Sequence, residues 1–198
     1  PVVGRRLASF LDLRAQSQRL EDAAALTPLW RFVLPGSDGN EQVDGHWVSS
    51  SFFQVLGVQP LKGRGFTANE DRPGGVPAVI VSYRLWRNHF DGDPNILGRA
   101  VPLNNSAAPI VGVMPPGFRF LDDVDLWAPL SQNPCLGRGR GVRLLRMVGR
   151  LAPGATLAQA QAEVEGIAGR LERAYPETNT GLGARVIALD DQLVGGIR

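Results

Sequence analysis

The chain has 198 residues, of which 43% are hydrophobic and 20% charged, so it can form one ordinary domain or two small lobes around a packed core. Its formal net charge of +2 is too small to indicate a nucleic-acid-binding surface. The single cysteine, Cys135, excludes an internal disulfide, and no apolar run approaches the roughly 18 residues that a membrane span needs.

The two ends of the sequence look cut. The first residues, PVVGRRLASF, lack the apolar stretch of a signal peptide. The last residues, DDQLVGGIR, stop just after a strand-like segment, with no closing element. We therefore expect an excised domain of a longer protein.

The first third of the chain predicts two short helices separated by a β-hairpin. Ser9 can cap the first helix, whose partial apolar face consists of Phe10, Leu13 and Leu20. Alternating residues at 29–34 and 42–49 predict the two strands of the hairpin. Apolar residues at 52–56 predict the second helix, and Gly57 follows at the position of a C-cap glycine.

The middle of the chain is rich in strands and tight turns. Thr67 and Glu70 have the spacing of a capping box. Ser82 is expected to cap a helix whose apolar face consists of Leu85, Trp86, His89 and Phe90. Four strands are expected, at 78–81, 100–103, 108–113 and 124–130.

The last third predicts a strand at 142–151, a long helix and a final strand at 183–189. Thr156 and Gln159 form the capping box of the helix, and Pro176 stops it. Its apolar face consists of Leu157, Ala160, Val164, Ile167, Ala168 and Leu171. Hairpins combined with strand–helix–strand units favour an α+β fold over a doubly wound sheet.

Ser49, Ser50 and Ser51 raise the question of a serine nucleophile, because His46 is close in sequence. Such a site needs a base and an oxyanion hole, and the G-x-S-x-G elbow is absent. We interpret the serines as the N-cap of the following helix. An enzyme in which Ser50 or Ser51 works with His46 remains a hypothesis.

Two glycine-rich stretches, GRGF at 63–66 and GRGRG at 137–141, match neither the P-loop nor the dinucleotide-binding pattern. Arginines on a glycine-rich loop could bind an acidic partner, but a solvated linker is the preferred interpretation.

Metal ligands are not grouped in the sequence. His46, His89 and Cys135 are isolated, and the carboxylates at 121–125 lack the calcium-loop pattern, so a solvated turn is expected there. The residues predict no catalytic, cofactor-binding or metal-binding site. They indicate a binding or interaction domain.

Five segments follow one another without interruption: VSSSFFQVLGV, PLKGRGFTANEDRPGG, VPAVIVSYRLWRNHFDGDPNILGR, VPLNNSAAPIVGVMPPGF and VDLWAPL. This order resembles the MacB-like periplasmic core domain of ABC transporter permeases. More narrowly, it is similar to the first extracytoplasmic domain of the duplicated permeases common in acidobacteria. SFLDLRAQSQRLEDAAAL and LVGGI also fit this family.

The resemblance implies an α+β fold with two lobes. A membrane-proximal strand–helix–strand (porter-like) lobe would combine residues 1–57 with 142–198. A smaller mixed α/β lobe would be inserted at 58–130, and 131–141 would be a connecting loop. The domain would lie on the periplasmic side of the bacterial inner membrane, as part of an integral membrane protein.

The resemblance also implies a non-catalytic role without a cofactor, in efflux or mechanotransmission. The domain would couple motion of the transmembrane helices of its own full-length chain to substrate or partner proteins outside. An ATP-binding subunit on the cytoplasmic side would act indirectly. Further partners would be a second permease domain or dimer mate and a periplasmic adaptor.

Such coupling requires stiff elements and a hinge. We expect the 156–175 helix to be stiff and the chain to bend where it crosses between lobes, at Gly57 and at 137–141. The alternative function is a free-standing periplasmic peptide- or lipid-binding protein, which would have an apolar pocket between the lobes.

Overall fold

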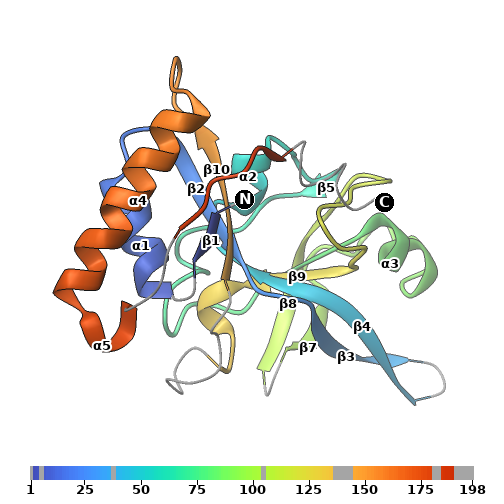
Figure 1. Cartoon of the computed structure of the whole chain (residues 1–198). Helices are drawn as coiled ribbons and strands as arrows, with labels where there is room; N and C mark the ends of the chain where they lie inside the picture. The colour runs from blue at the N-terminus through green and yellow to red at the C-terminus, as the bar shows by residue number, and fades with distance from the viewer. Residues whose placement is uncertain are drawn as a thin grey trace, which may run out of the picture.

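The computed structural model describes residues 2–4, 7–36, 39–103, 106–135, 145–179 and 184–189. Within these ranges the chain forms a curled, mixed β-sheet flanked by helices (Figure 1), which confirms the α+β class. The strands are ordered β1-β10-β2-β4-β9-β6-β8-β5, with β3 paired to β4 and β7 to β8. None of the described helices is long and apolar enough to cross a membrane.

The strands are β1 (Val2–Gly4), β2 (Leu20–Leu26), β3 (Trp30–Gly36), β4 (Gly39–Val48), β5 (Lys62–Gly63), β6 (Val79–Val81), β7 (Ala100–Leu103), β8 (Ser106–Val113), β9 (Leu126–Pro129) and β10 (Leu145–Leu151). The helices are α1 (Leu7–Gln16), α2 (Phe52–Leu56), α3 (Tyr83–Asn88), α4 (Leu157–Ala174) and α5 (Pro176–Asn179), with a 3-10 turn, η1 (Leu130–Gln132). Most of the predicted elements are therefore confirmed within one or two residues.

The strand order separates the chain into two parts along the sheet. β1, β10, β2 and β4 come from residues 1–57 and 142–198, which we call the flanking segments. β9, β6, β8 and β5 come from residues 58–130, the central segment. The two parts meet where β4 pairs with β9 in parallel, so one sheet runs through both. The division into two lobes stays a prediction.

Two layers of apolar side chains, one on each face of the sheet, make the core. One layer includes Phe10, Trp47, Trp86, Ile110 and Val164. The other includes Phe52, Phe53, Phe66, Phe120 and Trp127. Each layer draws residues from the flanking and the central segments, so the packing also crosses the boundary between them.

The helix α4 follows the sequence pattern closely. Thr156 and Gln159 form the expected reciprocal capping box. The buried residues are Ala160, Val164, Ile167 and Leu171. Leu157 is 39% exposed, because it lies in the first turn at the end of the helix. α4 packs beside α1 at the flanking end of the sheet (Figure 1).

The strand β2 was not expected from the sequence. Its residues, LEDAAAL, have low β propensity. Pairing with β10 over most of its length overrides that preference, and Leu20 belongs to this strand and not to the first helix. α1 begins at Leu7, so Ser9 lies within the helix and does not precede it.

Two other expectations are corrected. The described part of the expected last strand, residues 184–189, forms no strand, and the N–H of Val186 donates to the Gln161 side chain on α4. Thr67 is followed by a turn at 68–70 and not by a helix, although the Glu70 carboxylate accepts the Thr67 N–H at 2.7 Å as in a capping box. Asn104 and Asn105, between the expected strands at 100–103 and 108–113, and the 137–141 loop lie outside the described residues.

Candidate functional site

The boundary between the flanking and central segments lies between two strands of the sheet. β4 and β9 pair there in parallel, with Gly45 opposite Leu126 and Val48 opposite Pro129. We call this pairing, residues 45–48 with 126–129, the seam. A Cβ on Gly45 would lie 2.2 Å from the carbonyl oxygen of Leu126 and 2.7 Å from the Phe32 ring. Only glycine lets the two strands approach this closely.

Aromatic side chains cover one face of the seam. Phe53 of α2 contacts Trp127 of β9, with ring centroids 5.7 Å apart. Phe52 contacts Phe120 at 5.4 Å, and Phe53 also contacts Phe66 at 6.2 Å. Aromatic pairs at these distances stabilise beyond their buried area. The short helix α2 thus attaches the flanking segments to the central segment.

The sequence indicates that the serines before α2 cap this helix. In the structure their side chains bind elsewhere. Ser51 occupies the N-cap position but makes no capping hydrogen bond with its side chain. Its hydroxyl donates instead to the carbonyl of Ala23, and the Ser49 hydroxyl accepts the N–H of Ala25. Both bonds reach β2, a strand that the sequence pattern did not reveal. The serines therefore fix the start of α2 to the sheet.

Asp71 joins three parts of the chain. Its carboxylate accepts the N–H of Ser50 at 2.7 Å, just before α2, and the N–H of Ser131 at 3.0 Å, in η1. Asp71 belongs to the central segment, Ser50 to a flanking segment and Ser131 to the expected connecting loop. One carboxylate therefore binds the backbone close to the start and to the end of the central segment.

His46 lies in the seam and is buried, with 1% of its surface exposed. Its Nε2 lies 3.4 Å from the Asp122 carboxylate, which also lies 3.4 Å from the Arg146 guanidinium of β10. Neither ring nitrogen makes a hydrogen bond of normal geometry to the described residues. Burial lowers the pKa of His46, and the nearby Asp122 carboxylate only partly opposes this.

These positions bear on the hypothesis of a serine enzyme. The Ser49 and Ser51 hydroxyls contact each other and the backbone of β2, whereas the His46 ring faces Asp122. The structure does not bring the histidine and serines into the nucleophile–base contact that such catalysis needs.

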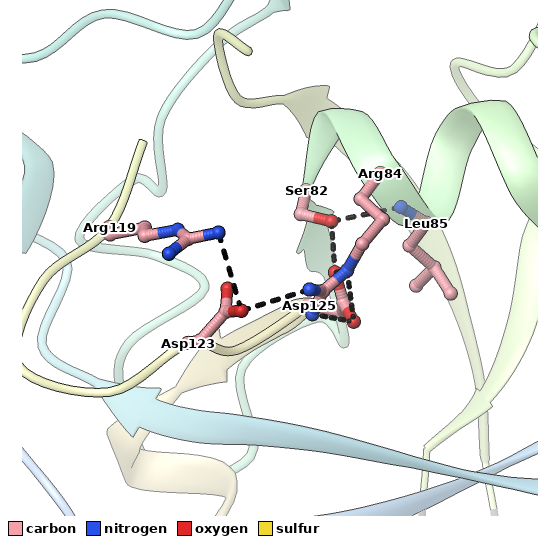
Figure 2. A network of polar contacts seen from close by, with 6 residues as sticks. All are labelled: Ser82, Arg84, Leu85, Arg119, Asp123 and Asp125. Carbon is pink, nitrogen blue, oxygen red and sulfur yellow. Dashed lines mark hydrogen bonds and ion pairs between the residues drawn. The ribbon is translucent and has the colours of Figure 1, made fainter. Parts of the chain in front are cut away.

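The carboxylates at 121–125 lie in an irregular segment and are partly exposed, as the expected solvated turn requires, but they also bind neighbouring side chains. Arg84 of α3 contacts Asp125 at 2.6 Å and Asp123 at 2.9 Å, and Arg119 lies 3.6 Å from Asp123 (Figure 2). The Ser82 hydroxyl donates to Asp125 and accepts the Leu85 N–H, which confirms its capping role. These hydrogen bonds raise the pKa of Arg84 and fasten α3 to the strand β9.

The GRGF stretch has a structural explanation as well. Gly63 ends β5 with a left-handed backbone, φ 72°, and a Cβ there would lie 2.2 Å from the carbonyl oxygen of Val111. Arg64 pairs with Glu70 at 2.6 Å. Burial alone would raise the pKa of Glu70, but hydrogen bonds from Arg64 and Thr67 lower it below the ordinary value. Arg64 is therefore part of the fold.

The described residues contain no group of three or more His, Cys, Asp or Glu side chains able to hold a metal ion. His46 and His89 contact different partners, since His89 Nδ1 lies 2.7 Å from the Glu41 carboxylate. The contacts of Asp71, Arg84 and Asp122 were not predictable, because each joins residues far apart in sequence.

An apolar groove of about 460 Å³ lies beside α2, β10 and the start of α4. Its walls include Leu20, Leu56, Leu151, Leu157 and Leu189, with Arg150 as the charged residue. All these residues belong to the flanking segments. The groove therefore differs from the pocket between lobes that the binding-protein alternative expects.

Residues 4–167 match the family described as the MacB-like periplasmic core domain. The chain belongs to this family. A search of curated proteins finds no match.

Solved structures of permease domains share the fold. The periplasmic region of MacB from Actinobacillus actinomycetemcomitans is 14% identical, with a TM-score of 0.70, and the match covers 98% of this chain and 83% of that one. The extracellular domain of the noncanonic ABC-type transporter YknZ from Gram-positive bacteria is 13% identical, with a TM-score of 0.64, covering 92% and 89%. Family and fold together make the chain an extracytoplasmic domain of a MacB-like ABC transporter permease.

Proposed function

We propose that this domain is non-catalytic and couples the motion of transmembrane helices to substrate or partner proteins outside the membrane, in efflux or mechanotransmission. It would act on the periplasmic side of the bacterial inner membrane. The observation that supports this role best is the continuity of the sheet through the seam. A displacement of the flanking segments would reach the central segment through β4 and β9.

Three kinds of contact make the seam stiff enough for this role. The backbones of β4 and β9 are paired, and the aromatic rings around Phe53 and Trp127 pack on one face. Asp71 binds the backbone close to both ends of the central segment. Packed interiors transmit displacement because they resist compression. The domain would therefore move as one body. Bending at the hinge expected at Gly57 would require these contacts to break.

The partners follow from the family and are proposals for this chain. The transmembrane helices of its own full-length chain would move the domain, and an ATP-binding subunit on the cytoplasmic side would supply the energy indirectly. A second permease domain or dimer mate and a periplasmic adaptor could receive the motion.

The groove gives some support to the alternative, a peptide- or lipid-binding protein. Its volume of about 460 Å³ is in the range of small-molecule sites, and most of its lining is apolar. Saturable binding of a fatty acid or an apolar peptide to the 198-residue chain, abolished by Leu151→Asp in a folded variant, would favour this alternative.

The coupling role can be tested with Gly45→Ala in the full-length permease, assembled with its ATP-binding subunit. The new Cβ would meet the Leu126 carbonyl at 2.2 Å and separate the seam. Gly65→Ala is the matched control, because nothing lies within 4 Å of a Cβ there. We expect Gly45→Ala to keep ATP hydrolysis and lose transport, and Gly65→Ala to keep both.

Hydrogen exchange on the same proteins reports whether the seam has opened. If Gly45→Ala loses protection at 45–48 and 126–128 but still transports normally, the coupling role is wrong. If Gly45→Ala fails to fold, Asp71→Ala provides a milder change, because it removes one carboxylate and leaves the strands paired.

A further inference from the structure

A buried histidine lies in the seam between the two parts of the sheet. His46 is on β4, opposite Trp127 of β9. Asp122 reaches it from the loop before β9, and Arg146 approaches the same carboxylate from β10. The three residues thus come from the central segment and from both flanking segments.

We propose that His46, Asp122 and Arg146 form an acid-sensitive joint, in which protonation of His46 loosens the seam between β4 and β9. At neutral pH the ring is uncharged and packs within the seam. A proton on the buried ring creates a charge that the surroundings stabilise poorly, and opening of the seam lets water reach it.

The geometry explains why Asp122 does not compensate for this charge. Asp122 is 36% exposed, so water screens its attraction for the ring. Its carboxylate is shared with Arg146, whose positive charge disfavours a second cation nearby. The backbone of Pro28 and of Thr27 also favours the imidazolium, but neither ring nitrogen makes a hydrogen bond of normal geometry to the described residues. The cost of burying a charged ring therefore exceeds the attraction of Asp122 for it, and the pKa of His46 is lowered.

Other charges close to the seam are already paired. Asp44, two positions before His46 on β4, lies 3.7 Å from Arg31 of β3. Asp125, just before β9, is held by Arg84. Among the described residues, Asp122 and Arg146 are the charged groups that act on His46.

The sign of the pH effect follows from the lowered pKa. The exposed ring has a pKa of 6.5, and the ring in the closed seam has a lower one, so the open state binds the proton more tightly. Seam stability is then full above pH 6.5 and is lost as the pH falls below it. Between the two pKa values, the opening constant rises by up to about tenfold per pH unit.

The test uses the 198-residue chain, which contains two histidines. Nuclear magnetic resonance should show two imidazole titrations, and His46→Gln identifies which belongs to His46. Hydrogen exchange, corrected for the intrinsic pH dependence, measures opening at 45–48 and 126–128. We expect His46 to titrate below 6.5 and seam opening to rise in acid. His46→Gln should remove that rise, whereas His89→Gln should leave it.

Two further variants separate this mechanism from loss of packing. Asp122→Asn removes the attraction for the imidazolium and should lower the His46 titration midpoint, while Arg146→Gln should raise it. A residue with only a packing role would not move the midpoint in opposite directions. Titration of His46 at or above 6.5, or acid-dependent opening that is unchanged in His46→Gln, would overturn the proposal. If His46→Gln does not fold, the opposite shifts in the other two variants decide the question.

Discussion

The carboxylate of Glu163 accepts the backbone N–H of Arg19 at 2.9 Å, and so joins α4 to the chain that enters β2. The same carboxylate accepts the N–H of Gln18 at 2.9 Å and the hydroxyl of Ser17 at 2.5 Å. Three donors from the residues between α1 and β2 therefore converge on one side chain of the long helix. This contact holds the two flanking segments together at their surface.

We expect Glu163→Ala to lower the free energy of unfolding by about 1–3 kcal/mol, because hydrogen bonds to a charged group are lost. Glu21→Ala is the control, since Glu21 is an exposed acidic residue of β2. Urea denaturation measures both. Equal midpoints for the two variants would show that the Glu163 contacts do not stabilise the fold.

The same carboxylate should contribute to acid sensitivity. Burial raises the pKa of Glu163, but the hydrogen bonds from Ser17, Gln18 and Arg19 outweigh it and lower the pKa below the ordinary value of 4.5. The stability from this group is present above 4.5 and is lost as the pH falls through the lower folded value. The difference in stability between wild type and Glu163→Gln should therefore shrink between about pH 6 and pH 3. A constant difference would contradict this assignment.

The network around Arg84 predicts unequal roles for two neighbouring aspartates. Asp125 is 18% exposed and binds both Arg84 and Ser82, whereas Asp123 is 47% exposed. Asp125→Ala should cost about 2–3 kcal/mol of unfolding free energy, because it leaves partly buried donors without acceptors. Asp123→Ala should cost less than about 1 kcal/mol, as for other exposed ion pairs. The reverse order in thermal denaturation would refute the assignment.

Two glycines should respond oppositely to alanine. Gly166 lies inside α4, and an added Cβ there meets nothing closer than an Arg170 nitrogen at 3.8 Å, so Gly166→Ala should stabilise by roughly 0.5–1 kcal/mol. Gly57 has a left-handed backbone, φ 71°, and its Cβ would lie 3.0 Å from Arg150. Gly57→Ala should destabilise by roughly 1–2 kcal/mol. Chemical denaturation that shows the same sign for both would be inconsistent with these conformations.

Local patterns in the sequence predicted much of the fold. The capping box at Thr156 and the left-handed Gly57 each depend on neighbours within a few residues, and both are confirmed. β2 was missed because its alanines and acidic residues gain a strand conformation only by pairing with β10. Long-range pairing of this kind leaves no periodic signal in one sequence.

The candidate site was less predictable for the same reason. The serine-rich stretch before α2 was recognised, but its partners, Ala23 and Ala25, belong to the missed strand. Asp71 reaches Ser50 across 21 positions and Ser131 across 60. The family resemblance, which rests on the order of whole segments, identified the chain where individual residues could not.

The central claim is that the domain transmits motion with its seam closed. Val48 and Pro129 are paired in register across the seam. Adjacent strands are about 4.8 Å apart, within the range that a disulfide can bridge. We would therefore introduce Val48→Cys with Pro129→Cys into the full-length permease, in a Cys135→Ser background. Arg31→Cys with Asp44→Cys is the control pair, because these residues face each other within the β3–β4 hairpin.

The decisive measurement is the transport rate of the oxidised seam pair against that of its reduced form and of the control pair. If motion passes through a closed seam, the cross-linked permease should transport at the rate of its reduced form. Loss of transport on oxidation of the seam pair, restored by reductant and absent from the control pair, would contradict the account. That result would favour the hinge between lobes that the sequence had suggested.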